Sequence, residues 1–254
     1  MPCSERGCLT MTEPQIEIAR LANKLKLTNF VDYKKHISSE APFENNLLTL
    51  LRLETDEKER SLMKQRLKSA SFPIVKTLDT FDFNNARLPY LKKEQLLELA
   101  SCDFIKEHTN VVAIGNCGTG KTHLMTAIGL EAVRKGYSVR FRRVNDLLTQ
   151  LREAKSDRHL NGMLKGLLKC RLLILDELGY VTLDAEDSKL LFQVLAGRYE
   201  LQSTIITSNH EFTKWPEIIG DPIMAEALVG RLVQRSTVLD MNGEGYRLRD
   251  KKKG

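Results

Sequence analysis

The residues best suited to chemistry in this sequence form one stretch, Gly115-Asn-Cys-Gly-Thr-Gly-Lys-Thr122. It fits the pattern G-x-x-x-x-G-K-[ST] of a phosphate-binding loop, whose backbone N–H groups surround a polyphosphate. An apolar run at 111–114 predicts a strand before it, and the pattern from His123 to Lys135 predicts a helix after it. The positive end of that helix would therefore also face the phosphates.

Each position of the loop has a physical role. Gly118 and Gly120 leave room for close approach of the ligand. Lys121 could reach the β- and γ-phosphates, and the Thr122 hydroxyl could bind Mg²⁺. A chance glycine-rich turn is the plain alternative, and the complete pattern between strand and helix argues against it. The sequence thus predicts a site for a nucleoside triphosphate and Mg²⁺, made by Gly115, Asn116, Cys117, Gly118, Thr119, Gly120, Lys121 and Thr122.

Two further motifs follow apolar runs that predict buried strands. Residues 171–177 end in Asp176 and Glu177, and residues 203–208 lead to Asn209. Ligands of parallel sheets sit at the carboxyl ends of the strands, so these side chains should meet the phosphate-binding loop. We expect Asp176 to help hold Mg²⁺, Glu177 to act as general base on the attacking water, and Asn209 to contact that water or the γ-phosphate.

Composition is that of an ordinary soluble protein, with 42% hydrophobic and 28% charged residues among 254. There is no apolar run of 18 residues, which excludes a membrane span, and residues 1–15 lack the apolar core of a signal peptide. The five cysteines are scattered and form no C-x-x-C pair, so neither a zinc site nor a disulfide framework is indicated. These features fit a reducing cytoplasm.

The net charge of +6 permits an anionic partner without requiring one. Residues 134–143 hold five basic residues and no acid, and residues 247–253 are also basic. Arg140, Arg142 and Arg143 are candidate DNA contacts from the first cluster. A solvated charged face is the ordinary explanation of such a cluster.

The order of predicted elements divides the chain near residues 70–80. Residues 1–70 predict a small helical interaction module, with Thr12 to Gln15 as a capping box. In its second helix, the predicted buried residues are Leu47, Leu48, Leu51, Leu62, Met63 and Leu67. Residues 71–90 predict an extended linker. Residues 91–254 alternate helix and strand, which indicates an α/β domain with a parallel sheet and strands near 111–114, 137–144, 171–176, 203–208 and 237–241.

Together these motifs resemble the IstB family. The resemblance rests on GNCGTGKTHL, LLILDELGY, IITSNHEF and the more family-specific GDPIMAEALVGRLVQRSTVLDMNGEGYRLRD, and it covers nearly the whole chain. Members are AAA+ ATPases encoded beside the transposase of certain bacterial insertion sequences, and they are related to DnaC-type helicase loaders and DnaA-like initiators. The unusual CSERGC N-terminus departs from the family.

The resemblance implies a bacterial cytoplasmic ATPase, stimulated by DNA, that forms homo-oligomers with ATP sites at subunit interfaces. It also implies double-stranded DNA and a cognate transposase as partners, and a P-loop AAA+ domain without a C-terminal helical lid. Arg231 or Arg235 would act as an arginine finger on a neighbouring subunit, with Arg231 slightly favoured. Residues 145–169 match the region where initiator-type ATPases add a helix, and Lys155, Arg158, Lys165 and Lys169 there are candidates for contacting DNA.

Two alternatives to a transposition helper remain. A helicase loader of DnaC type would share the motifs, although the AEALVGRL…YRLR ending favours the IstB family. A P-loop kinase or GTPase acting on a small partner is the second alternative. It lacks support because no N-K-x-D guanine signature is present, and because Asp176-Glu177 suits water activation better than transfer to a substrate.

Overall fold

The computed structural model describes residues 12–83 and 88–243 of the chain. The basic residues at 247–253 and the first ten residues lie outside the described residues. The chain divides into two compact units, residues 1–64 and 65–254, and the boundary falls inside one long helix. No helix among the described residues is both long and apolar enough to cross a membrane.

The first unit is helical. It consists of α1 (Glu13–Leu25), α2 (Thr28–Val31), the 3₁₀ helix η1 (Tyr33–Lys35) and the first part of α3 (Phe43–Ala70). The predicted capping residues begin α1, where Gln15 Oε1 accepts a hydrogen bond from the Thr12 backbone N–H at 3.1 Å. Glu54 of α3 is buried and accepts hydrogen bonds from the backbone N–H and side chain of Asn29, which ties α3 to α2.

The leucines expected to be buried in α3 are mostly exposed. Leu47, Leu48, Leu51 and Leu62 are each exposed by more than a third, whereas Leu50 and Ala70 are buried. The prediction of their burial is therefore wrong. The leucines fall on several sides of the helix, whereas α2 meets it at Glu54, so helical spacing alone did not identify the packed face.

The second unit is an α/β domain, as predicted. Its sheet has five parallel strands in the order β2-β3-β4-β1-β5. The strands are β1 (Asn110–Ile114), β2 (Val139–Arg143), β3 (Leu172–Leu178), β4 (Ser203–Ser208) and β5 (Ser236–Asp240). The helices of this unit are α4 (Lys93–Ser101), α5 (Asp103–Lys106), α6 (Lys121–Arg134), α7 (Val144–Ser156), α8 (Leu160–Lys169), α9 (Ala185–Arg198), α10 (Trp215–Ile219) and α11 (Pro222–Gln234), with 3₁₀ turns η2 (Leu78–Thr80) and η3 (Phe212–Lys214).

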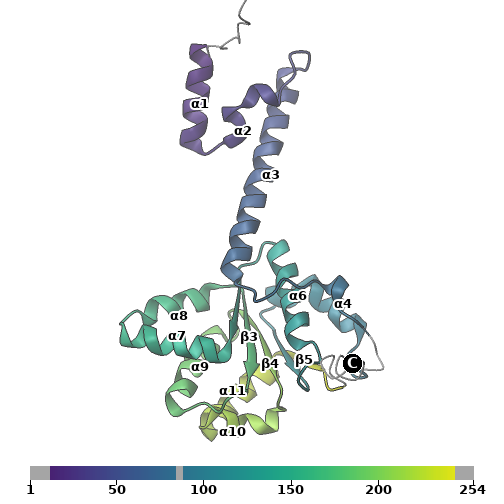
Figure 1. Ribbon diagram of the computed structural model, residues 1–254, viewed down its shortest axis with the longest axis vertical. Coiled ribbons are helices and arrows are strands. Elements are labelled where there is room, and N and C mark those ends of the chain that lie inside the picture. The colour runs from purple at the N-terminus through teal and green to yellow at the C-terminus, as the bar shows by residue number, and fades with distance from the viewer. Residues whose placement is uncertain (1–11, 84–87, 244–254) are drawn as a thin grey trace, which may run out of the picture. The chain divides into compact units, whose positions relative to one another are not determined.

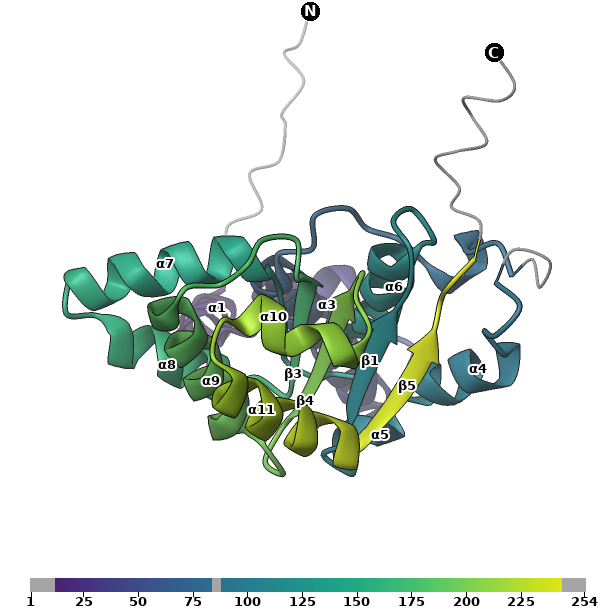
Figure 2. The ribbon, with the colours of Figure 1, turned by 90° about the horizontal axis from the view of Figure 1, so that it is seen from below.

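Helices cover both faces of this sheet (Figure 1). In the view of Figure 2, α10 and α11 lie in front of the strands and α6 lies behind them. Alternate residues of each strand face opposite sides. Val112 and Leu173 accordingly join the core under α7, α9 and α11, whereas Ile174 packs beside Gly129 of α6. Fully apolar strands such as 172–175 are required because both faces are buried.

Residues 72–83 were expected to form an extended linker, but two aromatic residues anchor them on the second unit. The Phe72 ring packs edge-on against Phe141 of β2, with the ring centroids 6.4 Å apart. Phe81 is only 5% exposed, and its ring meets that of His123 at 5.4 Å. Burial of these rings holds the segment against α6 and β2, so it is part of the wall of the domain.

Gly115 lies where β1 meets β5, and a Cβ there would stand 2.3 Å from the Met241 carbonyl oxygen. Backbone cannot move aside as a side chain can, so we expect Gly115→Ala to destabilise the fold by about 1–3 kcal/mol, the usual cost of overpacking. Gly162→Ala in α8 is the matched control, since nothing lies within 4 Å of its Cβ position. It should stabilise the helix by about 0.5–1 kcal/mol. Thermal unfolding of both variants checks this, and a Gly115→Ala melting temperature at or above that of wild type would contradict it.

Candidate functional site

The phosphate-binding loop runs from the end of β1 to the start of α6. Gly118 and Gly120 have φ values of 80° and 94°, in the left-handed region that glycine adopts without strain. The Lys121 Nζ donates to the carbonyl oxygens of Gly115 at 2.6 Å and Asn116 at 2.8 Å, which places the amine within the curve of the loop. Among the described residues no carboxylate pairs with this amine, so its charge is available to an anion.

Burial lowers the pKa of Lys121 below its ordinary value, and the nearby groups Cys117, Asp176 and Glu177 oppose that shift. The side chain is 8% exposed. A cationic group held in a poorly solvated place gains more from a polyphosphate than an exposed lysine would. The loop is thus electrostatically suited to a triphosphate.

Thr122 and Asp176 form the group that could hold a divalent cation. The Thr122 Oγ1 lies 3.0 Å from both carboxylate oxygens of Asp176, which is 1% exposed. No cluster of three or more His, Cys, Asp or Glu occurs among the described residues. A hydroxyl beside one carboxylate fits Mg²⁺, which proteins hold through one or two carboxylates while phosphates and waters complete the shell.

Glu177 stands next to this group at an irregular point of β3. The pairing of β3 with β4 shifts register between Leu175 and Leu178, and Glu177 has a φ of 64°. Its carboxylate lies 3.7 Å from the Arg143 Nε and is about half exposed. Both acids therefore lie at the carboxyl edge of the sheet, as the sequence predicted.

Asn209, just past the end of β4, also meets the loop. Its Nδ2 donates to the Sγ of Cys117 at 3.2 Å. Asn209 therefore lies beside the loop position that a terminal phosphate would approach. Cys117, expected to serve as a small side chain of the loop, is a free thiol.

Most residues predicted for the nucleotide site line one open cleft with a volume of about 780 Å³, within the range of ligand sites. Gly115, Asn116, Thr119 and Asp176 are not among its lining residues. The cleft brings together Cys117, Gly118, Gly120, Lys121, Thr122, Glu177 and Asn209. Its other lining residues are Lys76, Thr80, Phe81, Asp82, His123, Arg143, Tyr180 and Thr207.

Sequence reasoning missed the wall made by residues 76–82. The His123 Nε2 lies 3.2 Å from the Thr77 carbonyl oxygen and 3.1 Å from the Thr80 Oγ1, so the residue after Thr122 secures this wall. The signal in the sequence was the aromatic pair Phe81 and Phe83 in a segment otherwise typical of a linker. Because contact with α6 is non-local, no spacing rule would have identified it.

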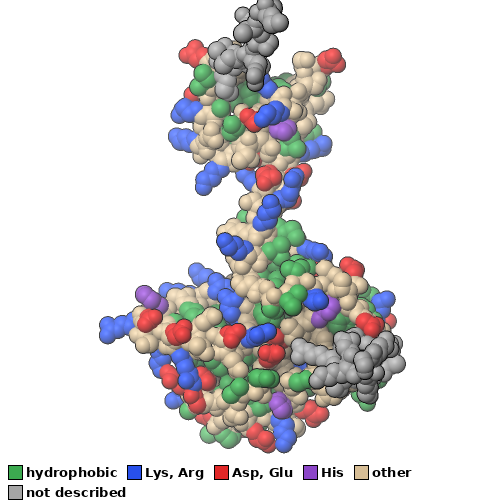
Figure 3. Space-filling view, viewed as in Figure 1, with side chains coloured by type: hydrophobic (Ala, Val, Ile, Leu, Met, Phe, Trp, Pro, Cys, Tyr) green, Lys and Arg blue, Asp and Glu red, His purple; other side chains and the backbone are tan. Residues whose placement is uncertain are grey.

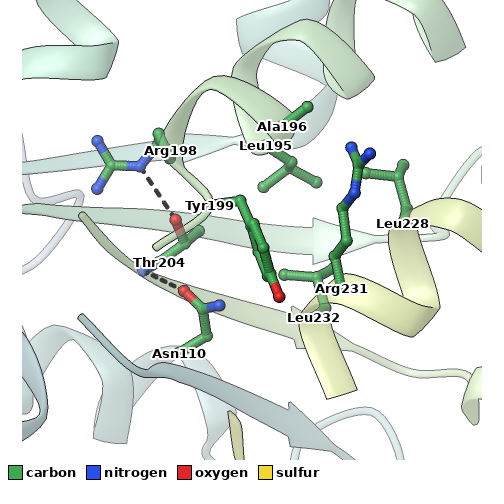
Figure 4. Close-up of a pocket in the computed structure, with 9 residues that line it drawn as sticks. All are labelled: Asn110, Leu195, Ala196, Arg198, Tyr199, Thr204, Leu228, Arg231 and Leu232. Atoms are coloured by element: carbon green, nitrogen blue, oxygen red, sulfur yellow. Dashed lines mark hydrogen bonds between the residues drawn. The ribbon is translucent and has the colours of Figure 1, made fainter. Parts of the chain in front are cut away.

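Arg231 and Arg235 lie away from this cleft. Arg231 is on α11, with its guanidinium carbon 5.4 Å from the centroid of the Phe192 ring. Figure 4 shows Arg231 at a small cavity of about 10 Å³, beside Tyr199 and Leu228. That volume holds about one water molecule, so the cavity is not a ligand site. Arg235 precedes β5, at the amino ends of the strands, and its guanidinium pairs with Glu200 at 3.6 Å.

The seven DNA candidates do not form one group. Arg143 lines the cleft, and Arg140 and Arg142 are half-buried in β2, with Arg140 against Gly166 of α8. Lys155 pairs with Glu186 of α9 at 2.6 Å. Arg158, Lys165 and Lys169 are exposed, as are Arg143 and Lys155. Basic and acidic side chains are mixed over α7 and α9 on the face seen in Figure 3.

Comparison with known proteins agrees with the motifs. The family model described as "IstB-like ATP binding protein" matches residues 20–254. The chain belongs to this family. The IstB-type chain is 37% identical to the ATP-binding protein assigned to insertion sequence IS232 of Bacillus thuringiensis, over 95% of this chain and 94% of the relative. It is 36% identical to the counterpart from IS21 of Pseudomonas aeruginosa, over 93% of this chain and 91% of the relative.

Solved structures show the same fold. The DnaC helicase loader aligns with a TM-score of 0.55 at 24% identity, over 70% of this chain and 98% of that one. DnaI aligns with a TM-score of 0.55 at 20% identity, over 71% of this chain and 93% of that one. The expected fold, a central parallel sheet flanked by helices, is confirmed and is shared with DnaC and DnaI. No helix follows β5 within residues 12–83 and 88–243 of this IstB-type chain.

Proposed function

We propose that this protein is an ATP- and Mg²⁺-dependent ATPase that assembles on double-stranded DNA during transposition and recruits or stimulates the transposase of its insertion sequence. The observation that carries the proposal is that Lys121, Thr122 and Glu177 line one cleft and that the buried Asp176 contacts Thr122, in a chain of this family. The relatives named as ATP-binding proteins of insertion sequences support the nucleotide and the biological setting.

The residues of the three motifs each have a part in hydrolysis. The loop N–H groups and Lys121 bind the β- and γ-phosphates, and Thr122 and Asp176 hold Mg²⁺, which neutralises charge on the phosphates. Glu177 accepts a proton from the water that attacks the γ-phosphorus as the bond to the β-phosphate breaks. Asn209 orients that water or the γ-phosphate. Arg143, 3.7 Å from Glu177, competes for the same carboxylate.

The arginine finger of this proposal comes from a second copy of the chain. Neither Arg231 nor Arg235 lines the cleft of its own subunit. Arg231 has no carboxylate partner in the part of the chain that the structure describes, whereas Arg235 is paired with Glu200. A guanidinium without a carboxylate partner is free to meet a phosphate, so this supports Arg231 as the finger.

A helicase loader is the second candidate, supported by the fold shared with DnaC. A fold hosts many functions, so this likeness is weaker than the match to insertion-sequence relatives. Affinity capture from the host separates the two, because a loader would retain a hexameric helicase and a transposition helper would retain the transposase.

Glu177→Gln should keep ATP binding and lower phosphate release by about 10²–10⁴-fold, because the amide cannot accept the water proton. Lys121→Ala should lose ATP binding itself, and Asp176→Asn should weaken its Mg²⁺-dependent part. Fluorescent-nucleotide anisotropy and phosphate release measure the two quantities. Hydrolysis by Glu177→Gln at the wild-type rate would show that the general base is a different residue.

Arg231→Ala should lower turnover by about 10³–10⁵-fold, as removal of other arginine fingers does. Arg235→Ala, on the same side of the fold, serves as the comparison and should retain most activity. Mixing the Arg231→Ala protein with the Lys121→Ala protein should restore some activity, because the two replacements affect different halves of a shared site. Wild-type specific activity should also rise with protein concentration. Turnover unaffected by either arginine replacement would exclude action across subunits.

Duplex DNA should bind through phosphate contacts, with log affinity falling with log salt at a slope of about −0.9 per phosphate neutralised. Lys165→Ala and Lys169→Ala should each make that slope shallower by about 0.9, because both amines are exposed. Lys106→Ala, an exposed lysine already paired with Asp103, is the control. A salt titration with ATP analogue, with ADP and without nucleotide tests this; equal binding in all three states would refute ATP-dependent assembly on DNA.

A further inference from the structure

One buried hydroxyl contacts both acids of the cleft. The Thr207 Oγ1 of β4 lies 2.6 Å from the Asp176 Oδ1 and 2.9 Å from the backbone nitrogen of Glu177. Thr207 is 1% exposed, as is Asp176. Thr207 lies within β4, two residues before Asn209, and no motif of the sequence assigns it a role.

The direction of both hydrogen bonds is fixed by chemistry. A backbone N–H can only donate, so the Thr207 oxygen must accept from Glu177. An ionised carboxylate can only accept, so the Thr207 hydroxyl must donate to Asp176. One side chain therefore uses its donor and an acceptor lone pair on two adjacent residues. Valine has the same shape and could make neither bond.

The bonds occur where the sheet ladder is interrupted. Leu175 pairs with Ile206 and Leu178 pairs with Ser208, so Asp176 and Glu177 together stand opposite Thr207 alone. Glu177 is in the left-handed region, which costs a non-glycine residue free energy and persists only where neighbours hold it. The Thr207 hydroxyl takes the N–H that a regular ladder would have satisfied. It thereby holds the bulge that turns both acids toward the cleft.

We propose that Thr207 is a positioning residue that sets the orientation of the Asp176 carboxylate and the place of Glu177 together. This rests on the proposed function, because Asp176 must serve a divalent cation and Glu177 the water. With its Oδ1 held by Thr207, the carboxylate keeps one face toward Thr122, whose hydroxyl meets both oxygens. Although Thr207 is among the residues at the cleft, its hydroxyl is used by Asp176 and by the Glu177 backbone, so in this proposal it acts through the two acids.

The test measures cation binding apart from turnover. Mn²⁺ affinity of the complex with a non-hydrolysable ATP analogue is followed by electron paramagnetic resonance, beside phosphate release at saturating nucleotide. Thr207→Val should weaken Mn²⁺ binding by about 10–100-fold, the usual effect of losing a group that orients a metal ligand. It should lower kcat while nucleotide affinity without metal stays unchanged. Thr207→Ser retains the hydroxyl and should recover both quantities to within a few-fold.

Two controls separate positioning from stability. Thr204→Val makes the same replacement in the same strand at 2% exposure, where the hydroxyl accepts from the Arg198 Nε at 3.0 Å instead. It should lower the melting temperature and leave Mn²⁺ affinity unchanged. Thr207→Cys against Thr207→Ser differs in one atom, because a thiol is a weak donor and acceptor. This pair supports the same conclusion if Thr207→Val does not fold.

The outcomes are distinct from those that test the function itself. Wild-type protein that neither binds Mn²⁺-nucleotide nor hydrolyses ATP would refute the proposed ATPase. Active wild type with unaltered Mn²⁺ affinity and kcat in Thr207→Val, or in Thr207→Cys, would overturn the role of Thr207 alone. An equal loss of Mn²⁺ affinity in Thr204→Val would do the same, because the effect would then follow from weakening of the strand.

Discussion

The Asp176 carboxylate, buried at the carboxyl edge of the sheet, is the group on which the arrangement of the cleft depends. It receives hydroxyl groups from two other elements, Thr122 at the start of α6 and Thr207 in β4. A buried carboxylate without such partners would cost several kcal/mol, so these bonds are a condition of its being there. These hydrogen bonds join the start of α6, β3 and β4 at one point.

The Lys121 amine and the Asp176 carboxylate do not form a salt bridge with each other. Lys121 donates to backbone carbonyls, and Asp176 accepts from hydroxyl groups, so neither neutralises the other at salt-bridge distance. Each therefore keeps capacity for an outside group of opposite charge. A triphosphate with its divalent cation supplies both charges, which is why this geometry suits that ligand better than a simple anion.

Basic residues outside the cleft serve differing purposes although the sequence presents them as clusters. Arg152 and Lys155 of α7 pair with acids of α9 or its N-cap, and so link two helices of the same layer. Arg198 is almost fully buried and donates to Thr204 and to carbonyl groups of Leu167 and Ser203. Burial lowers the pKa of Arg198, and its hydrogen bonds compensate the lost hydration. A count of basic residues therefore overstates the charge available to an anionic partner.

The sequence by itself determined the parallel α/β sheet and the residues that meet at its carboxyl edge. Apolar runs mark strands buried on both faces, and the phosphate-binding loop, Asp176-Glu177 and Asn209 each follow such a run, so local pattern was enough. Only the tertiary structure decided which residues surround them. Phe81, His123 and Thr207 lie 42 to 126 positions apart along the chain, and their contacts depend on strand order and on the bulge in β3. The same holds for α3, whose helical character was clear from its sequence, while its buried residues were set by contacts with other segments, such as that of Glu54 with Asn29 of α2. The spacing of hydrophobic residues reflects local backbone geometry, whereas contacts between distant segments produce no regular spacing in the sequence.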